Sequence, residues 1–314
     1  MQPLQVLDGA ALSQRLPFDA LVAALRAAFA AADITVPLRH SHTIGDDNRV
    51  LLMPAWRTGG AFAVKTVTVF PGNGAAGLPA VHGLVTLFDG ATGMPLAVLD
   101  GSELTARRTA AASALAADFL ARSDATRLLV VGAGRVAALL PVAMRCVRPG
   151  LQRVTVWNRS PGAAETLAAR WREDGIDACA ATDLQTAVAD ADIVSCATLS
   201  TAPLVQGAWL QAGTHLDLIG SFTPAMRETD AACFDKSRVW VDTEEALHKS
   251  GDLLEAMAAG SFNADELQGT LATLCRGSVQ GRPDTEAGAR VVTVFKSVGT
   301  ALEDLAAAEL ALGH

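Results

Sequence analysis

Residues 128–137 read LLVVGAGRVA, an apolar run of four residues followed by a glycine turn and the start of a helical pattern. A continuous apolar run predicts a strand that is buried on both faces, as in a parallel sheet. Gly132 permits a tight turn, Gly134 lets the backbone approach a ligand, and Ala137 allows close packing of helix on strand. The helix N-terminus adds N–H donors and the positive end of a dipole, which suit a pyrophosphate. The stretch predicts a dinucleotide-binding turn formed by Gly132, Ala133, Gly134, Arg135 and Val136.

Further apolar runs follow this turn and alternate with helical stretches. The runs cover residues 154–157, 192–196, 215–219 and 239–241, and helical patterns cover residues 161–173 and 183–188. Buried strands that alternate with helices are typical of an α/β fold with a doubly wound parallel sheet. This context favours a bound dinucleotide over a glycine-rich turn that binds nothing.

The pattern differs on either side of this region. Residues 17–32 have the apolar spacing of an amphipathic helix, and short β-rich runs follow at 50–53, 61–70, 83–88 and 95–99. An alanine-rich helix begins at Ser102 or Thr105 and continues to about residue 122, and a strand and a long helix are expected within 291–312. We therefore predict one domain from residues 1–122 plus 291–314 and a second, dinucleotide-binding domain from residues 123–290.

Composition excludes several classes of protein. The 314 residues carry 25 Lys and Arg against 33 Asp and Glu, so the net charge is −8, which opposes a nucleic-acid binder. The sequence has no Tyr, so a tyrosine acid or base is excluded. Five cysteines without a C-x-x-C pair and scattered histidines indicate neither a disulfide framework nor a metal site. No leader or membrane-spanning pattern is evident, so a soluble cytoplasmic protein is expected.

The residues after the second predicted strand indicate which dinucleotide binds. An NAD site places Asp or Glu there to accept bonds from the ribose hydroxyls, whereas this chain has Asn158, Arg159 and Ser160. An amide, a guanidinium and a hydroxyl suit a 2′-phosphate, so NADP(H) is favoured and NAD(H) is possible. Ser160 can also act as the N-cap of the next helix, with Pro161 in the first turn.

Several segments together resemble one family. DGSELTARRTAA at 100–111 resembles the signature that precedes the nucleotide domain in ornithine cyclodeaminases and mu-crystallins, and similar matches occur across the chain at 37–39, 53–54, 64–65, 70–73 and 295–299. The resemblance implies a Rossmann domain inserted between two parts of an α+β substrate-binding and dimerisation domain. It also implies a homodimer, which composition alone does not show.

The resemblance implies a site for a small amino or imino acid, whose carboxylate is bound by Arg39, Lys65 and Arg108. A carboxylate favours guanidinium partners, and a lysine such as Lys65 inside an apolar strand is unfavourable unless paired or functional. On the residues alone Arg39 can equally be a solvated loop residue, and the resemblance rather than the spacing selects Arg108 over Arg107. Lys65 is the candidate proton donor. The residues implied on the cofactor side are Thr109, Thr198, Ser221 and Ser297.

One departure from the family bears on the reaction. Ornithine cyclodeaminases carry an acid–base Asp in the segment that reads GSFTPAMRE here, and Phe222 occupies its place. A phenyl ring cannot handle the protons that loss of ammonia requires. We therefore predict an NAD(P)H-dependent reductase of a small cyclic imino acid, such as Δ1-pyrroline-2-carboxylate or Δ1-piperideine-2-carboxylate. The alternatives are an ornithine cyclodeaminase, an alanine-type amino-acid dehydrogenase, or a non-catalytic NADPH-dependent ligand binder.

Overall fold

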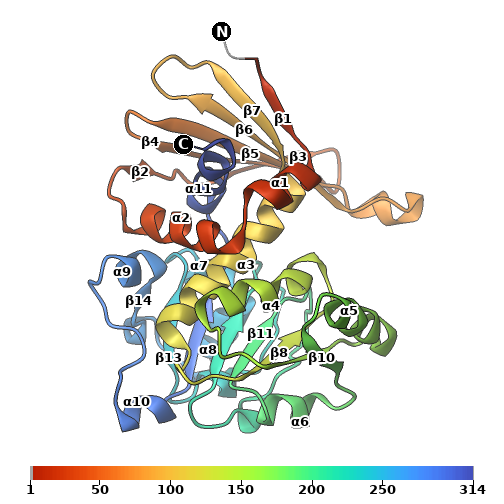
Figure 1. Ribbon diagram of the computed structural model, residues 1–314, viewed down its shortest axis with the longest axis vertical. Helices are drawn as coiled ribbons and strands as arrows, with labels where there is room; N and C mark the ends of the chain where they lie inside the picture. Colours follow the sequence, from red (N-terminus) through yellow and green to blue (C-terminus); the bar gives the residue numbers. More distant parts are fainter. Residues whose placement is uncertain (1–2, 314) are drawn as a thin grey trace. The chain divides into compact units, whose positions relative to one another are not determined.

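The computed structural model describes residues 3–313, which form two compact units (Figure 1). The first unit contains the residues up to Thr109 and those from Thr300, and the second is Ala110–Gly299. These junctions differ from the predicted ones after residues 122 and 290. Helix α3 (Gly101–Leu120) runs through the first junction without a break, and strand β15 (Thr293–Lys296) pairs within the second unit's sheet. Residues 1, 2 and 314 of the predicted first domain lie outside the described part.

The first unit is built on a mixed sheet in which β1 pairs parallel with β7 and the other pairs are antiparallel. The order is β1-β7-β6-β5-β4-β2, and β3 also pairs with β4. Three of the four predicted strand segments lie within longer strands, and the segment 61–70 extends one residue beyond β5. The bounds of the strands are β1 (Gln5–Leu7), β2 (Ile34–Thr35), β3 (His40–Ile44), β4 (Asn48–Arg57), β5 (Ala61–Val69), β6 (Val81–Asp89) and β7 (Pro95–Asp100).

Helix α11 (Ala301–Leu312) covers one face of this sheet (Figure 1). It packs on β4, β5 and β6, and helices α1 (Gly9–Arg15) and α2 (Phe18–Ala30) pack on it in turn. The period of two along each strand buries alternate residues against α11, among them Met53, Lys65 and Val85, which lie in register on neighbouring strands. A lysine therefore lies in the middle of the buried face.

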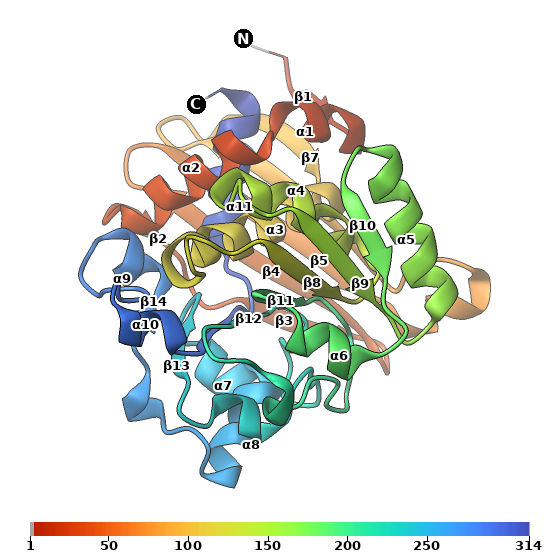
Figure 2. The same ribbon diagram turned by 60° about the horizontal axis from the view of Figure 1, so that its bottom comes forward.

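The second unit contains a parallel sheet with the order β10-β9-β8-β11-β12-β15-β13-β14 (Figure 2). The chain proceeds outward from β8 to β9 and β10, then returns to the other side of β8 with β11, so the order reverses between β8 and β11. Ligands of open α/β sheets bind at the carboxyl ends of the strands beside such a reversal. The bounds are β8 (Arg127–Val131), β9 (Arg153–Trp157), β10 (Asp177–Ala180), β11 (Ile193–Cys196), β12 (His215–Leu218), β13 (Arg238–Val241) and β14 (Gly269–Thr270).

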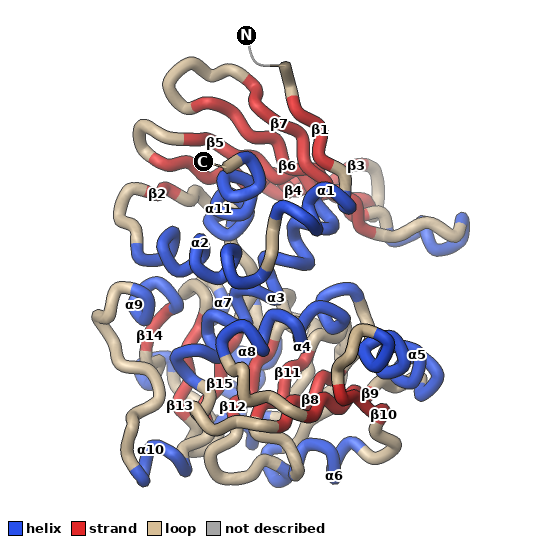
Figure 3. Tube along the Cα trace, viewed as in Figure 1, coloured by secondary structure: helices blue, strands red, loops and turns tan. Residues whose placement is uncertain are grey.

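Helices alternate with these strands, as predicted (Figure 3). The predicted helix at residues 161–173 is confirmed as α5, whereas the short strand β10 was not predicted because its mixed composition gives no apolar run. No helix within residues 3–313 is both long and apolar enough to cross a membrane. The remaining α-helices are α4 (Arg135–Val147), α5 (Pro161–Glu173), α6 (Leu184–Ala189), α7 (Ala246–Lys249), α8 (Gly251–Ala259), α9 (Leu271–Cys275) and α10 (Glu286–Arg290).

Candidate functional site

Lys65 and Arg108 come together in the first unit around two carboxylates of α11. The Lys65 ammonium is 2.7 Å from Oδ2 of Asp304. The Arg108 guanidinium donates through Nε to Oδ1 of Asp304 at 3.1 Å and through an NH group to Glu303 at 2.5 Å. All four side chains are buried. We call Lys65, Arg108, Glu303 and Asp304 the α11 cluster.

The local sequence explains how α11 supplies both acids. Thr300 is the N-cap of the helix, and its hydroxyl accepts a bond from the Leu302 N–H. Glu303 and Asp304 therefore fall in the first turn, where the helix dipole favours negative charge. The four residues that follow, Leu305 to Ala308, are apolar and buried in the same helix. The acids reach the buried cations because α11 lies on the sheet face that contains Lys65.

Charge balance sets the protonation states in the α11 cluster. Burial is the largest influence on Lys65 and lowers its pKa, Arg108 also lowers it, Asp304 and Glu303 oppose the shift, and the net pKa is about 8. Burial also lowers the pKa of Arg108, but the two carboxylates outweigh it and the net pKa is raised. For Asp304 burial alone would raise the pKa, yet Lys65 and Arg108 hold it below its ordinary value. The structure thus contains a charged cluster with a lysine that can titrate near neutral pH.

These contacts leave donors for a ligand. A guanidinium has five N–H donors and an ammonium three, and the contacts above use two and one of them. A substrate carboxylate can therefore be bound by Lys65 and Arg108 while Asp304 keeps the two cations side by side.

The neighbouring Arg107 has a different role. Its Nε donates to the Leu16 carbonyl at 3.0 Å, another nitrogen donates to Ser13, and its guanidinium lies over the Phe18 ring at 4.7 Å. Adjacent helical residues project about 100° apart, so Arg107 joins α3 to α1 and α2 while Arg108 faces α11. The two arginines therefore have separate partners, and Arg108 stays the predicted site residue.

Arg39 is half-buried between β2 and β3, one residue before β3 begins. The histidines that follow it, His40 and His42, are exposed on β3. Arg39 stays a predicted ligand of the substrate carboxylate.

The sequence missed Glu303 and Asp304. Their available signal is the presence of two adjacent acids in the first turn of a largely apolar helix, because buried acids are uncommon unless paired. The sequence cannot identify their partners, since Asp304 and Arg108 are 196 residues apart along the chain.

The glycine turn has the predicted conformation. Gly132 has a φ of 115°, and a Cβ there would lie 2.5 Å from the Ala197 carbonyl, so only glycine fits. Gly134 is the N-cap of α4, and a Cβ there would meet no protein atom within 4 Å. The protein itself does not require glycine at 134, so the open space above it fits the close approach of a pyrophosphate to the helix N-terminus. The residues present therefore fit a dinucleotide.

The segment after β9 contains the predicted 2′-phosphate residues. Arg159 and Ser160 are exposed, and Asn158 is half-buried with its amide donating to the Ser160 carbonyl at 3.2 Å. Ser160 occupies the N-cap position of α5, with Pro161 in the first turn, but its side chain makes no capping bond. The Ser160 hydroxyl and the Arg159 guanidinium are accessible to a ligand.

Thr198, Ser221 and Ser297 follow three neighbouring strands, β11, β12 and β15, at their carboxyl ends. Thr198 is half-buried, whereas Ser221 is buried and its hydroxyl donates to the Met226 carbonyl at 2.6 Å. Ser297 is also buried, and Thr109 is half-buried on α3 beside Arg108. The buried, bonded hydroxyl of Ser221 indicates that this residue shapes its loop.

Asp217 and Phe222 lie in or near the segment where cyclodeaminases carry their acid–base residue. Asp217 is fully buried on β12 and accepts bonds from the Ser195 and Ser113 hydroxyls. Burial raises its pKa to about 6, against these bonds and Lys296. Phe222 is 43% exposed and has no titratable group. Asp217 is enclosed within the fold, so neither residue supplies an accessible acid.

Comparison with known proteins gives one consistent family. The model of the ornithine cyclodeaminase/mu-crystallin family matches residues 6–312. A Δ1-pyrroline-2-carboxylate reductase of Paracoccus denitrificans (strain Pd 1222) is 43% identical over 254 residues, which cover 80% of this chain and 78% of that protein.

Two solved structures have the same fold over nearly the whole chain. The Δ1-pyrroline-2-carboxylate reductase of Thermococcus litoralis, in complex with NADH and L-proline, has a TM-score of 0.91 and 32% identity, covering 99% of this chain and 97% of that one. An archaeal alanine dehydrogenase dimer with bound NAD has a TM-score of 0.90 and 27% identity, covering 99% and 95%.

Proposed function

The chain belongs to the ornithine cyclodeaminase/mu-crystallin family, and we propose that it is an NAD(P)H-dependent reductase of a small cyclic imino acid. The observation that carries the proposal is the buried pairing of Lys65 and Arg108 around Asp304, which keeps two cations together in a position for one carboxylate. The similarity to Δ1-pyrroline-2-carboxylate reductases supports this substrate class.

The proposed reaction divides the work between substrate-binding and cofactor-binding residues. Arg108, Arg39 and Lys65 bind the substrate carboxylate and so orient the C=N bond, and orientation of this kind lowers a barrier substantially. Lys65, with its pKa lowered to about 8, supplies a proton to the imine nitrogen. A reduced nicotinamide held at the glycine turn would supply the hydride, two electrons and one hydrogen, that together with this proton converts C=N to an amine. The product is a cyclic amino acid.

Phe222 supports reduction over deamination. The cyclodeaminase reaction moves protons on an amine that leaves as ammonia and on an attacking amine, which requires an acid–base group that Phe222 does not have. An alanine-type dehydrogenase shares the scaffold, as the archaeal structure shows, so that activity belongs in the same assay.

The test measures oxidation of NADPH and of NADH with Δ1-pyrroline-2-carboxylate and Δ1-piperideine-2-carboxylate. Parallel assays measure ammonia release from L-ornithine with NAD, and NADH oxidation with pyruvate plus ammonia. We expect turnover with the cyclic imines and no ammonia release. Ammonia and proline from ornithine would overturn the proposal, and silence with every imine would favour a non-catalytic binder.

The accessible Arg159 and Ser160 support a preference for NADP(H), because a guanidinium can pair bidentately with a 2′-phosphate. The two solved relatives described above contain NADH and NAD, so NAD(H) is retained as the second cofactor in the assay. The cytoplasmic location expected from the sequence stays a prediction.

A homodimer is supported by the face of the first unit's sheet that turns away from α11. Leu52 and Leu84 lie in line on this face, and Leu84 is 53% exposed. Trp56, Phe62 and Phe88 form a row of contacting rings on the same face, with centroids 6.3 and 5.6 Å apart. An apolar face of this kind typically marks an interface, and a second copy of the chain is the proposed occupant.

Sedimentation of the wild type and Leu84→Lys tests the dimer. We expect the wild type at twice the mass of one chain and the variant at the mass of one chain. Leu78→Lys is the matched control, because Leu78 is equally exposed but lies in the loop outside the sheet. A monomeric wild type, or a variant that still dimerises, contradicts this interface.

A further inference from the structure

Glu228 joins two loops at the carboxyl ends of β11 and β12. It is fully buried, and its Oε1 accepts bonds from the Thr198 backbone N–H at 2.7 Å and the Thr198 hydroxyl at 2.9 Å. Its Oε2 accepts the Gly220 N–H at 2.7 Å. Three donors from two separate loops therefore converge on one carboxylate.

The backbone around Glu228 is itself fixed. Its N–H donates to Asp252 at 2.8 Å, and its carbonyl accepts the N–H groups of Leu204 and Val205. A Cβ at Gly220 would lie 1.9 Å from the Thr198 carbonyl and 2.5 Å from the Glu228 carboxylate. Only glycine lets the two loops approach this closely, so Glu228 acts from a rigid position.

These loops border the reversal of strand order between β8 and β11, where open α/β sheets bind nucleotides. We propose that Glu228 is a positioning residue that holds the loops at Thr198 and Gly220 in the conformation that binds the dinucleotide. The inference rests on the proposed function, because it assumes that the second unit binds such a cofactor.

The ionised form of Glu228 suits this role, because the groups that contact its carboxylate oxygens all donate hydrogen bonds. Burial raises its pKa to about 7, Lys296 on β15 opposes the shift, and Asp252 on α8 adds to it. Cys196 on β11 is a further titratable group that interacts with it. As pH falls below about 7, a larger fraction of Glu228 is protonated and its acceptor capacity falls. Affinity for the dinucleotide is therefore expected to fall with it.

The test measures Kd for NADH and for NADPH directly, by fluorescence titration of the full-length protein without any imino acid. Glu228→Gln replaces one acceptor oxygen by an NH2 group. That group faces a hydrogen-bond donor of the loops and cannot accept its bond. We expect Kd to rise roughly tenfold or more, as for loss of a bond to a charged group. Turnover at saturating cofactor is expected to change much less, so the effect lies in KM for the dinucleotide and not in kcat.

Asp192→Asn is the matched control. Asp192 accepts the same kinds of donor, the Thr126 N–H at 2.9 Å, the Thr126 hydroxyl at 3.2 Å and the Arg127 N–H at 3.0 Å. These contacts lie at the amino end of β8, away from the proposed cofactor edge. The control is expected to retain wild-type Kd even where its thermal stability falls. Equal weakening in both variants would show a general structural role and overturn the inference.

The pH profile of the wild type provides a second measurement that does not depend on how the variant folds. Kd for the dinucleotide is expected to rise as pH decreases from 8 to 6, and Glu228→Gln is expected to remove this dependence. A wild-type Kd that is constant over this range overturns the inference. A wild type that binds dinucleotide but reduces no imino acid overturns the proposed function alone. A wild type that binds no dinucleotide overturns both.

Discussion

The two units differ in how their buried positive and negative side chains are balanced. The α11 cluster pairs two cations, Lys65 and Arg108, with two carboxylates. In the second unit one buried lysine, Lys296, acts on Glu228 and Asp242. Burial raises the pKa of a carboxyl group in both units, but Asp304 in the α11 cluster ends below its ordinary value whereas Glu228 ends at about 7.

The comparison shows that burial alone does not determine the protonation state of a carboxylate. Desolvation disfavours the charged form everywhere, so the direction of the shift depends on how many cations are in contact. Asp304 contacts two cations directly. Asp242 accepts the N–H groups of Val298 and Gly299 and still has a raised pKa. We therefore expect stability to fall when a charged side chain is removed from the α11 cluster. In the second unit we expect the buried carboxylates to change their protonation with pH.

Among the substitutions that test this comparison, removal of Arg108 is expected to have the largest effect. Arg108→Ala leaves Glu303 and Asp304 buried without their guanidinium, so we expect the free energy of unfolding to fall by about 3–5 kcal/mol in urea denaturation. KM for the imino acid should rise steeply in the same variant.

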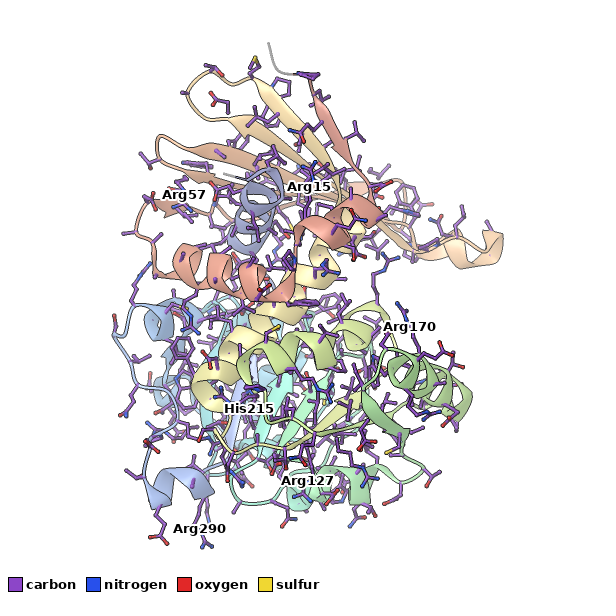
Figure 4. All side chains as sticks on the ribbon, viewed as in Figure 1. Arg15, Arg57, Arg127, Arg170, His215 and Arg290 are labelled. Atoms are coloured by element: carbon purple, nitrogen blue, oxygen red, sulfur yellow. The ribbon has the colours of Figure 1, made fainter. Side chains whose placement is uncertain are left out.

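Arg57→Ala is the control, because Arg57, which is labelled in Figure 4, also pairs with an acid of α11, Glu309, and with Asp33. Its side chain is 30% exposed. Exposed pairs contribute about 0–1 kcal/mol each. An equal loss in the two variants would show that burial does not distinguish them.

Asp217→Asn tests the opposite case, a buried carboxylate held by hydroxyl groups. The pKa of Asp217 is raised from 3.8 to about 6, so the folded state binds more protons than the unfolded state between these values. Stability is therefore lost as pH rises through this window. An amide can accept from one serine and donate to the other, so we expect the variant to gain about 1–3 kcal/mol at pH 8 and little below pH 4.

Urea denaturation at several pH values measures this difference. Asp304→Asn is the paired variant, and it should lose stability at pH 8 because Lys65 and Arg108 then lack their shared acid. Asp217→Asn that loses stability at pH 8 would contradict the assignment of a desolvation penalty to Asp217.

The lowered pKa of Lys65 predicts that activity decreases at alkaline pH, as an alkaline limb of the pH profile. Only the ammonium form binds a carboxylate and donates a proton, so kcat/KM for the imino acid should fall roughly tenfold per pH unit above about 8. Lys65→Arg stays protonated, and its activity should lack this limb, whatever its absolute rate. Ionisation of the substrate affects both proteins equally. An identical limb in the two proteins would show that Lys65 does not titrate in the reaction.

Removal of the exposed cation Arg159 is expected to have the smallest effect, and this effect is confined to binding of the cofactor. Arg159→Ala should weaken NADPH binding by up to about tenfold while NADH binding and protein stability change little. Arg153→Ala is the control, since Arg153 is exposed at the other end of the same strand, β9. Equal effects on NADPH and NADH would contradict a contact with the 2′-phosphate.

Much of the second unit could be predicted because its signals are local. The run at 128–131, the glycine turn and the helix at 161–173 each depend on neighbouring residues, and the structure contains all three as expected. The junctions between units could not be predicted from local signals. Helix α3 is continuous across the first, and β15 follows an irregular segment yet pairs with β12 and β13.

The candidate site was predicted in part for the same reason. A lysine in an apolar strand and an arginine in a family signature can be recognised in sequence, so Lys65 and Arg108 were predicted, and the structure brings them together at Asp304. Asp304 and Glu228 were not predicted, because each acts through partners that are distant along the chain.

The sequence by itself determined the parallel α/β unit and the glycine turn, and it singled out two cations as predicted ligands of a substrate carboxylate, because periodicity and motifs are properties of adjacent residues. Tertiary structure alone decided which acids neutralise these cations and which carboxylates retain a raised pKa. Those outcomes depend on burial and on distances between charges, which arise only when α11 packs on β5 and when the loops after β11 and β12 meet at Glu228.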